Sequence, residues 1–581
     1  MKVFLDLKWF FIQEKKSYIT GAILLLLVAF LQLIPPKVVG IVVDRIKGHS
    51  LITEDMVKWI LILILTALSM YGLRFVWRIM IFGSATKLSR LLRNELYHHF
   101  TKMSPAFYQK RRVGDLMAHA TNDIQAIQQT AGVGVLTLVD SLATGGFVIL
   151  AMAFTISWKL TLIALIPMPL MAILTSYYGT LLHKRFHKAQ EAFSALNDKT
   201  QESVAGIKVL KTFGQEKEDI ESFRLHSEEV VQKNISVARV DSLFDPTISI
   251  IVGISFFLSI VFGSKFVITG GMTIGELISF TTYLGLLIWP MLAFGWLFNI
   301  VERGRASYDR VAALLNEKVD IENSGVLEQA PTGDIDYRIF SFSYPGEDVN
   351  TLEEIHFSIQ KGQTIGIVGK TGAGKTTLLK LLLREFEGYK GEVRYGGNVI
   401  QNYKLRYLRD CIGYVPQDHF LFSATIQENI AFSNPMTLVA QVQSAAAQAH
   451  IHEDISRFPN GYATVVGERG VSLSGGQKQR ISIARALLMD PEILILDDSL
   501  SAVDSKTEES ILTSLKQNRA GKTTMITSHR LSAIQHADLI IVLEAGKIIE
   551  RGSHLELMKE NGWYREMYLS QQLEKLVEHG G

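Results

Sequence analysis

The chain has 581 residues, enough for several domains, and its 59 Lys and Arg nearly balance its 57 Asp and Glu, giving a formal net charge of +2. A balance this close leaves no basic surface of the kind that binds nucleic acid, and it argues against a long disordered tail. Because Cys411 is the single cysteine, a disulfide-stapled secreted scaffold and a cysteine-based zinc site are both excluded.

The apolar residues are concentrated before about residue 305. The leading segment, with Phe4, Leu7 and Phe10 among lysines, is typical of a helix lying on a membrane surface. Six apolar stretches follow, each long enough for the roughly 20 residues that a spanning helix needs. They are 19–43, 57–82, 136–158, 160–182, 248–268 and 277–300. The sequence therefore predicts an α-helical domain of about six helices in a lipid bilayer, rather than the buried helices of a large soluble protein.

The charges of the loops predict the orientation of these spans. Lys and Arg are abundant between the second and third spans and between the fourth and fifth, whereas the third-to-fourth link holds only Lys159 and the fifth-to-sixth link only Lys265. The positive-inside rule places the long basic segments and the N-terminus in the cytoplasm, and an even number of spans leaves the C-terminus there too. Apolar residues recur at helical spacing in the basic segments. We therefore expect helices that continue into the cytoplasm and turn near Gly114 and Gly206.

Some polar and aromatic residues of this half have two interpretations. Arg74, Arg78 and Asp140 fall within or near the spans, where a charge indicates function unless its side chain snorkels to the membrane surface. Four aromatic residues near the last span could line a cavity for apolar ligands or could pack between helices. They are Trp289, Phe294, Trp296 and Phe298.

The second half alternates strand-like and helical runs, which is the pattern of an α/β domain. We expect a transmembrane domain at residues 1–312, a linker at 313–333 and the α/β domain at 334–581. One run follows a strand-like segment, opens a helical one and matches the P-loop pattern. Its residues are Gly369, Lys370, Thr371, Gly372, Ala373, Gly374, Lys375 and Thr376, with Thr377 next. Glycines let backbone amides close around phosphate oxygens, and the helix N-terminus favours their negative charge.

Three residues carry the predicted chemistry of this loop. Lys375 should reach the β- and γ-phosphates, and Thr376 should ligate Mg²⁺. The buried strand 493–496 ends in Asp497, whose carboxylate we expect to hold the same ion directly or through water. These residues alone predict a P-loop nucleoside triphosphatase.

A further motif makes the prediction sharper. The run Leu473-Ser474-Gly475-Gly476-Gln477 resembles the signature of the ATP-binding-cassette (ABC) family, and the resemblance extends over nearly the whole chain. It implies that Tyr344 stacks on adenine, that Gln417 senses Mg²⁺ and contacts the membrane domain, and that His529 contacts the γ-phosphate. It also implies that residues 467–470 abut the coupling helices and that residues 501–504 cross a dimer interface.

The order of the domains is similar to that of a half-transporter of the multidrug exporter type, in a bacterial plasma membrane. In that family two cassettes sandwich two ATP molecules, and each site combines the P-loop of one chain with the signature of the other. The resemblance thus assigns Ser474, Gly475, Gly476 and Gln477 to ATP bound on a partner chain. Closing the sandwich opens the membrane cavity outward.

One residue departs from the family pattern. Catalytic chains carry Glu after the strand-terminal Asp, as the general base toward water, but this chain has Asp498. The side chain is one methylene shorter, and a misplacement of about 1 Å costs roughly 10²-fold in rate. Asp498, His529 and Gln417 are the predicted catalytic residues, and the site on this chain's own P-loop should be slow. An intact signature beside a short base resembles one subunit of heterodimeric bacterial exporters, whose partner supplies the glutamate.

The predicted function is therefore a subunit of an ATP-driven efflux pump for amphipathic small molecules. The alternatives are a homodimer that hydrolyses ATP slowly at two Asp sites, a homodimeric lipid flippase, an exporter-fold importer and an ATP-gated channel. Drug-stimulated ATPase activity together with uphill uptake into inverted vesicles would separate a pump from a channel.

Overall fold

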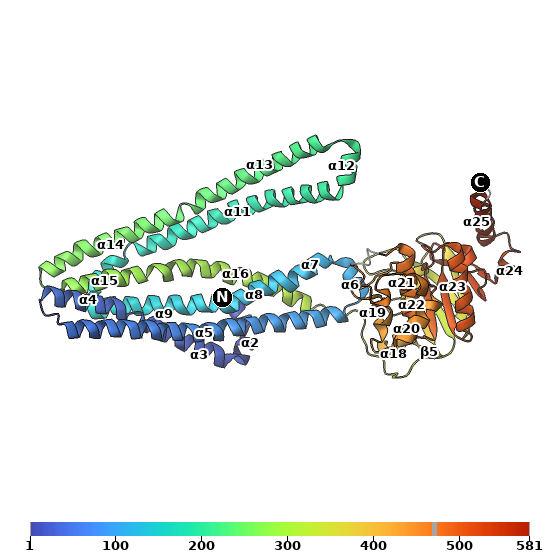
Figure 1. Ribbon diagram of the computed structural model, residues 1–581, viewed down its shortest axis with the longest axis horizontal. Coiled ribbons are helices and arrows are strands. Elements are labelled where there is room, and N and C mark those ends of the chain that lie inside the picture. The colour runs from blue at the N-terminus through green and yellow to red at the C-terminus, as the bar shows by residue number, and fades with distance from the viewer. Residues whose placement is uncertain (1, 468–472, 580–581) are drawn as a thin grey trace. The chain divides into compact units, whose positions relative to one another are not determined.

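The computed structural model describes residues 2–467 and 473–579. The chain divides into two compact units, Met1–Thr101 with Val113–Glu317, and Lys102–Arg112 with Lys318–Gly581. Figure 1 labels most of their helices and strand β5.

The first unit is helical throughout its described residues, and its long helices carry the apolar stretches. They are α1 (Lys2–Asp6), α2 (Lys8–Gln13), α3 (Lys15–Leu31), α4 (Ile34–Lys47), α5 (Thr53–Lys102), α7 (Val113–Ala118), α8 (Ile124–Gln129), α9 (Val135–Ala151), α10 (Trp158–Leu165), α11 (Met168–Ala205), α12 (Ile207–Phe213), α13 (Glu216–Asp241), α14 (Phe244–Ile268), α15 (Ile274–Leu286) and α16 (Ile288–Leu315). Three π-helical turns interrupt the third span and its extension: η1 (His119–Asp123), η2 (Thr130–Gly134) and η3 (Met152–Ser157).

Five helical segments of the described chain are long and apolar enough to cross a membrane. They are Lys15–Lys47, Thr53–Lys102, Val113–Leu165, Glu216–Ile268 and Ile274–Leu315. The third and fourth predicted spans meet at Ser157, which leaves the helical conformation at φ −160° and caps α10. The fourth stretch then continues through α10 into α11, and the two helices are separated at Ile166 and Pro167, because proline lacks a backbone donor.

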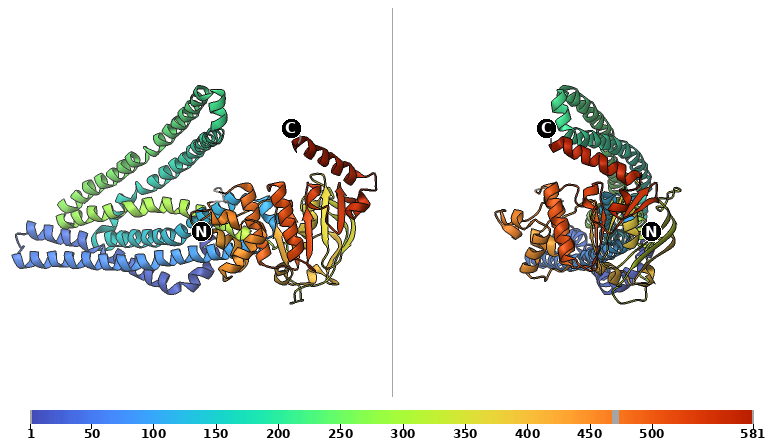
Figure 2. Two further views of the ribbon diagram at one scale, coloured as in Figure 1. Left: turned by 45° about the vertical axis from the view of Figure 1, so that its right-hand side comes forward. Right: turned by 90° about the vertical axis from the view of Figure 1, so that its right-hand side faces the viewer.

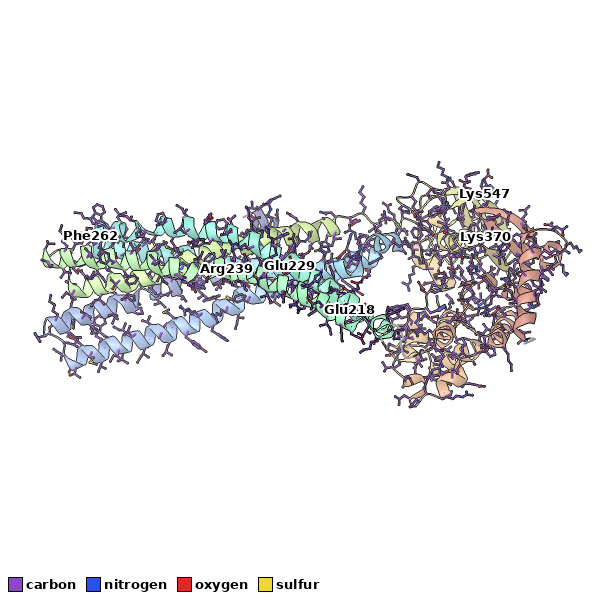
Figure 3. The ribbon with its side chains drawn as sticks, turned by 90° about the horizontal axis from the view of Figure 1, so that it is seen from above. Glu218, Glu229, Arg239, Phe262, Lys370 and Lys547 are labelled. Atoms are coloured by element: carbon purple, nitrogen blue, oxygen red, sulfur yellow. The ribbon has the colours of Figure 1, made fainter. Side chains whose placement is uncertain are left out.

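The turns that follow α5 and α11 contain short helices. The prediction of a first turn near Gly114 was wrong: α5 ends at Lys102, Pro105 opens the short helix α6 (Pro105–Lys110), and Gly114 already lies in α7. Proline is favoured in the first turn of a helix, which explains why the chain restarts there. The second turn contains α12, which follows Gly206 and has no buried residue. Figure 2 shows α11 and α13, which flank α12, running side by side. Figure 3 labels Glu218, Glu229 and Arg239 along α13.

Helices α4 and α15 pack unusually closely. A Cβ atom added to Gly275 would lie 2.0 Å from the carbonyl oxygen of Gly40, so this crossing requires glycine. The carboxylate of Asp44 accepts from the backbone N–H of Gly275 at 2.8 Å, and the hydroxyl of Tyr283 donates to the carbonyl oxygen of Leu33 at 2.7 Å. The pair is therefore held by hydrogen bonds along its length as well as by backbone contact.

A polar cluster joins the extension of the third span to α16. Asp123, which is 8% exposed, accepts from the Ser307 hydroxyl at 2.8 Å and from Arg310 Nε at 3.0 Å. His119 Nδ1 lies 2.6 Å from the same carboxylate. A buried carboxylate needs such donors, because it has left water.

The second unit contains two sheets. The antiparallel sheet has the order β2-β1-β4-β5 and the larger sheet the order β10-β9-β3-β8-β7-β6. The strands are β1 (Ile335–Phe342), β2 (Leu352–Ile359), β3 (Thr364–Gly369), β4 (Lys390–Tyr395), β5 (Asn398–Val399), β6 (Ile412–Val415), β7 (Ile493–Asp497), β8 (Thr523–Thr527), β9 (Leu539–Glu544) and β10 (Lys547–Gly552). Strands β9, β3, β8, β7 and β6 are parallel, and β7 and β8 are buried along their whole length, as in sheets covered on both faces.

The helices of this unit are α6, α17 (Lys375–Leu382), α18 (Leu405–Asp410), α19 (Ile426–Ile430), α20 (Val439–Gln448), α21 (His452–Ser456), α22 (Gly475–Leu488), α23 (Ser505–Asn518), α24 (His554–Leu557) and α25 (Trp563–His579). Asn429, 1% exposed, ties α19 to the loop before it, because its Oδ1 accepts from the N–H of Phe422 at 2.9 Å and its Nδ2 donates to Phe422 O at 3.0 Å and Thr425 O at 3.1 Å. Arg485 of α22 donates to Asn429 Oδ1 at 3.0 Å and to Asn429 O at 2.7 Å. These hydrogen bonds join the loop after β6 to α22.

Candidate functional site

The P-loop connects β3 to α17, and its glycines adopt conformations that other residues avoid. Gly369, Gly372 and Gly374 have φ values of +147°, +82° and +96°. A Cβ at Gly369 would lie 2.0 Å from the carbonyl oxygen of Leu543, whereas one at Gly372 would meet nothing within 4 Å. The first glycine is thus required by packing, and the second by the turn of the backbone.

Lys375 opens α17 and lies inside the loop. Its ammonium donates to the carbonyl oxygens of Gly369 at 2.8 Å and Lys370 at 3.0 Å. Burial lowers the pKa of Lys375, and the carboxylates of Asp498 and Asp497 oppose that shift. Lys370, labelled in Figure 3, instead forms an ion pair of 2.9 Å with Glu544 on β9. Lys375, rather than Lys370, is therefore the lysine that lies near the carboxylates of Asp497 and Asp498.

The carboxylate of Asp497, at the end of β7, is 1% exposed and accepts three hydrogen bonds. Its Oδ1 accepts from Thr376 Oγ1 at 3.0 Å and Thr527 Oγ1 at 2.7 Å, and its Oδ2 accepts from Tyr414 Oη at 3.2 Å. Burial, and then Asp497 itself, raise the pKa of Tyr414, which keeps the phenol protonated as a donor. No motif of the sequence predicted a role for Thr527 or Tyr414, although each stands two or three residues before a predicted site residue.

Asp498 follows in the left-handed region, at φ +46°. Its backbone N–H donates to Thr527 Oγ1 at 2.9 Å and to Thr527 O at 3.1 Å, and its carbonyl accepts from Ser501 Oγ at 3.0 Å. Asp is one of the few residue types enriched in this backbone region. The turn that presents the Asp498 carboxylate is thus fixed on both sides.

Register brings the remaining predicted residues to the same edge of the sheet. Val415 of β6 lies beside Leu496, and Asp497 lies beside Thr527 of β8. Gln417 and His529, both exposed, follow these strands by two residues each. Because carboxyl ends of parallel strands share one edge, both lie with the P-loop and the carboxylates at the place where α/β sheets bind ligands.

Tyr344 and the signature lie on other elements. The Tyr344 hydroxyl is 2.8 Å from Thr377 Oγ1, which places its ring beside α17. Ser474 caps α22 through a reciprocal pair of bonds with Gln477, and a Cβ at Gly476 would lie 2.9 Å from Ala502 O. Within residues 2–467 and 473–579, no hydrogen bond or ion pair joins Ser474–Gln477 to the P-loop. Of the predicted motif 467–470, residues 468–470 lie outside the described residues.

The structure is compatible with both interpretations of the charged and aromatic residues singled out in the membrane domain, namely a functional role or a place at the membrane surface or in helix packing. Arg74 and Arg78 are exposed on α5, and the half-buried Asp140 accepts from Thr144 at 3.3 Å. Trp289, Trp296 and Phe298 are more than half exposed on α16, at 62%, 53% and 56%, and the side chain of Phe294 lies outside the described residues.

Comparison with known proteins decides the family. Residues 18–291 match the family described as ABC transporter transmembrane region, and residues 352–501 match ABC transporter. Over 576 residues the chain is 47% identical to a "probable multidrug resistance ABC transporter ATP-binding/permease protein", YheI, of Bacillus subtilis (strain 168), covering 99% of this chain and 98% of the relative. The chain belongs to the ABC transporter family.

Two further relatives define the type of ABC transporter. The chain is 47% identical over 578 residues to the multidrug resistance-like ATP-binding protein MdlA of Escherichia coli (strain K12), covering 100% of this chain and 98% of the relative. The structure of a bacterial Atm1-family ABC exporter with ATP bound superposes with a TM-score of 0.79 at 26% identity, over 95% of this chain and 99% of that one. This ABC transporter is thus an exporter-type half-transporter: a helical membrane domain precedes an ATP-binding domain of the ATPase-coupled transporter family.

Proposed function

We propose that this chain is one subunit of a heterodimeric multidrug exporter and supplies the slower of its two ATP sites. The pair uses ATP to move amphipathic small molecules out of a bacterial cell. The observation that carries the proposal is Asp498, which stands where a general base is needed, while Ser474 and Gly475 of the signature are intact. The multidrug resistance names of the relatives support the substrate class.

The backbone geometry at Asp498 supports its proposed role as a poor general base. A general base must reach hydrogen-bond distance of the attacking water. The backbone N–H of Asp498 is held by both the carbonyl and the hydroxyl of Thr527, so the backbone does not advance to replace the missing methylene. Hydrolysis on this chain's P-loop should therefore be slower by roughly 10²-fold than at a site with glutamate.

The ligands of the site are proposed to be ATP and Mg²⁺. The Thr376 hydroxyl and Asp497 Oδ1, 3.0 Å apart, are oxygen donors of the kind that Mg²⁺ prefers, and Gln417 lies at the same sheet edge. Bound there, the ion would neutralise charge on the phosphate oxygens. Lys375 would bind the β- and γ-phosphates, and Tyr344 would stack on the base.

A partner chain completes each site. Ser474 and Gly476 contact their own helix and residue Ala502, which leaves them free to receive ATP held by another P-loop. The partner proposed is a second half-transporter that carries Glu at the position of Asp498. The cytoplasmic location of both termini and the domain boundaries at 312 and 334 remain predictions.

The decisive experiment measures ATPase activity of this chain alone and of the pair that it forms with the neighbouring half-transporter. Asp498→Asn should change the steady-state rate of the pair only modestly, whereas Glu→Gln at the equivalent position of the partner should lower it by roughly 10²-fold or more. Gly475→Glu in this chain should also stop turnover, because it blocks the signature that faces the partner's site.

Two outcomes would contradict the proposal. If Asp498→Asn lowers the activity of the pair by two orders of magnitude, Asp498 is a competent base. If this chain alone hydrolyses ATP rapidly and Asp498→Asn abolishes that activity, the homodimer is correct. Uphill uptake of a fluorescent amphiphile into inverted vesicles tests export directly, and ion conduction without uptake would identify a channel.

A further inference from the structure

The C-terminal helix α25 holds the backbone from His529, the residue predicted to contact the γ-phosphate, to Leu531, on both sides of Arg530. Nε2 of Gln571 donates to the carbonyl oxygen of His529 at 2.8 Å, and Oε1 of Gln571 accepts from the backbone N–H of Leu531 at 2.9 Å. One side-chain amide thus pairs with the loop through a donor and an acceptor, as a neighbouring strand would. The His529 side chain is exposed, and no hydrogen bond or ion pair of its imidazole occurs among the described residues.

Helix α25 is itself fixed to the sheet. The carboxylate of Glu550 on β10 accepts from the N–H groups of Trp563 at 2.5 Å and Tyr564 at 3.2 Å, which satisfies the first turn of the helix. Tyr564 is fully buried, and the hydroxyl of Tyr568 donates to Gln535 Oε1 at 3.1 Å. Tyr564, Tyr568 and Gln571 are spaced by four and three residues along α25 and therefore share one face of the helix. Gln571 is thus presented from a rigid support.

The other side of the His529 loop is tied to the segment 501–504. Arg530 donates from Nη1 to Val503 O at 3.1 Å and from Nη2 to Ser501 O at 3.2 Å. It also forms an ion pair of 3.0 Å with Glu508 on α23. The loop is therefore held between α25 and the segment that lies against the start of α22, and the bonds of Gln571 set its position on the α25 side.

We propose that Gln571 is a positioning residue of the nucleotide site: it fixes the peptide of His529 so that the imidazole faces the γ-phosphate of ATP on this chain's P-loop. This rests on the proposed role of His529 and extends that site to the C-terminal helix. The amide is needed because it is donor and acceptor at once. A methionine of similar length is neither, and a carboxylate has acceptors only and would face the carbonyl oxygen of His529.

The test uses photolabelling of this chain by azido-ATP with Mg²⁺ in the purified full-length transporter, together with its partner. Gln571→Met should raise the azido-ATP concentration for half-maximal labelling by roughly tenfold, because two hydrogen bonds are lost. Gln572→Met is the matched control: this neighbouring glutamine is partly buried and makes no side-chain hydrogen bond among the described residues, so its labelling curve should match that of the wild type.

Gln571→Glu separates positioning from packing. As the pH is lowered from about 8 to about 4.5, close to the usual Glu pKa of about 4.3, protonation of the new carboxyl group restores a donor, so labelling relative to wild type at the same pH should recover. Dividing the labelling of the variant by that of the wild type at the same pH cancels any effect of pH that acts through the neighbouring histidines, His529, His536 and His554. The same ratio for Gln571→Met should stay flat.

The proposal is overturned if Gln571→Met labels like Gln572→Met and unfolds at the wild-type temperature. It is also overturned if the pH ratio for Gln571→Glu stays flat, which decides the matter should Gln571→Met fail to fold. Lys375→Ala distinguishes failure of the underlying assignment: if labelling persists in that variant, the P-loop is not the labelled site and the proposed function fails instead. Because the label reports on this chain, the result does not depend on which partner completes the pair.

Discussion

Replacing Asn429 by leucine tests the buried hydrogen bonds that join the loop after β6 to α22. The side chain is 1% exposed, and its amide satisfies the N–H and C=O of Phe422, the carbonyl of Thr425 and one N–H of Arg485. Leucine has a similar branched shape but no polar atoms, so the N–H of Phe422 loses its partner, while the carbonyls of Phe422 and Thr425 and the Arg485 side chain keep only their other hydrogen bonds. An unsatisfied buried group costs about 1–3 kcal/mol, although Arg485 and part of the loop can turn to water. We expect a loss of about 3 kcal/mol in the free energy of unfolding of the ATP-binding domain.

For a domain of this size, such a loss lowers the Tm by roughly 6–12 °C. Thermal unfolding of the full-length chain in detergent, followed by intrinsic fluorescence, measures it. Asn434→Leu is the control, because Asn434 is exposed and its side chain accepts a single bond of 3.3 Å from the N–H of Met436. Equal melting temperatures for the two variants would refute the reasoning, since the polar groups around residue 429 would then be satisfied without it.

Three other predictions follow from the same contacts. Lys375→Ala should remove most azido-ATP labelling of this chain, because the phosphates lose their nearest cation; unchanged labelling would refute the P-loop assignment. Thr527→Val should raise the Mg²⁺ concentration for half-maximal labelling by about tenfold, because Asp497 loses its 2.7 Å donor, whereas Thr527→Ser should stay near wild type; equal values for both would show that this hydroxyl is irrelevant. Asp123→Asn should lower the Tm of the chain by a few degrees, because Arg310 and Ser307 would face a neutral amide that accepts fewer bonds; an unchanged Tm would mean that the cluster adds nothing to stability.

Local patterns predicted the parts of the molecule that depend on local physics. The P-loop could be recognised because its glycines, Lys375 and Thr376 are consecutive and their conformation follows from residue type. Asp497 could be predicted because it ends a buried strand-like run in the same domain as the P-loop, whereas His529 was predicted only from the family resemblance. The apolar stretches marked the long helices, since about 20 apolar residues are needed to cross a bilayer.

Contacts made across long stretches of sequence could not be predicted in this way. Gln571 lies 40 residues beyond Leu531, and no periodicity or motif distinguishes it from Gln572. In the sequence, Tyr414 is indistinguishable from an ordinary strand residue. Its hydroxyl contacts Asp497 only because of the register between β6 and β7. The turn after α5 was misplaced because helical spacing continues across the break, and Pro105 was a local signal of it.

The glycine crossing of α4 and α15 limits how the membrane domain can change shape. One turn away on the same helix faces lie Pro36 and Asp44 on α4 and Ser279 on α15. If either helix slid by one turn along the other, one of these larger side chains would enter a space too small for a single methyl group. Helices α4 and α15 should therefore move together as one rigid body. Any sliding between helices during a conformational change must then occur at other helix–helix contacts of the membrane domain.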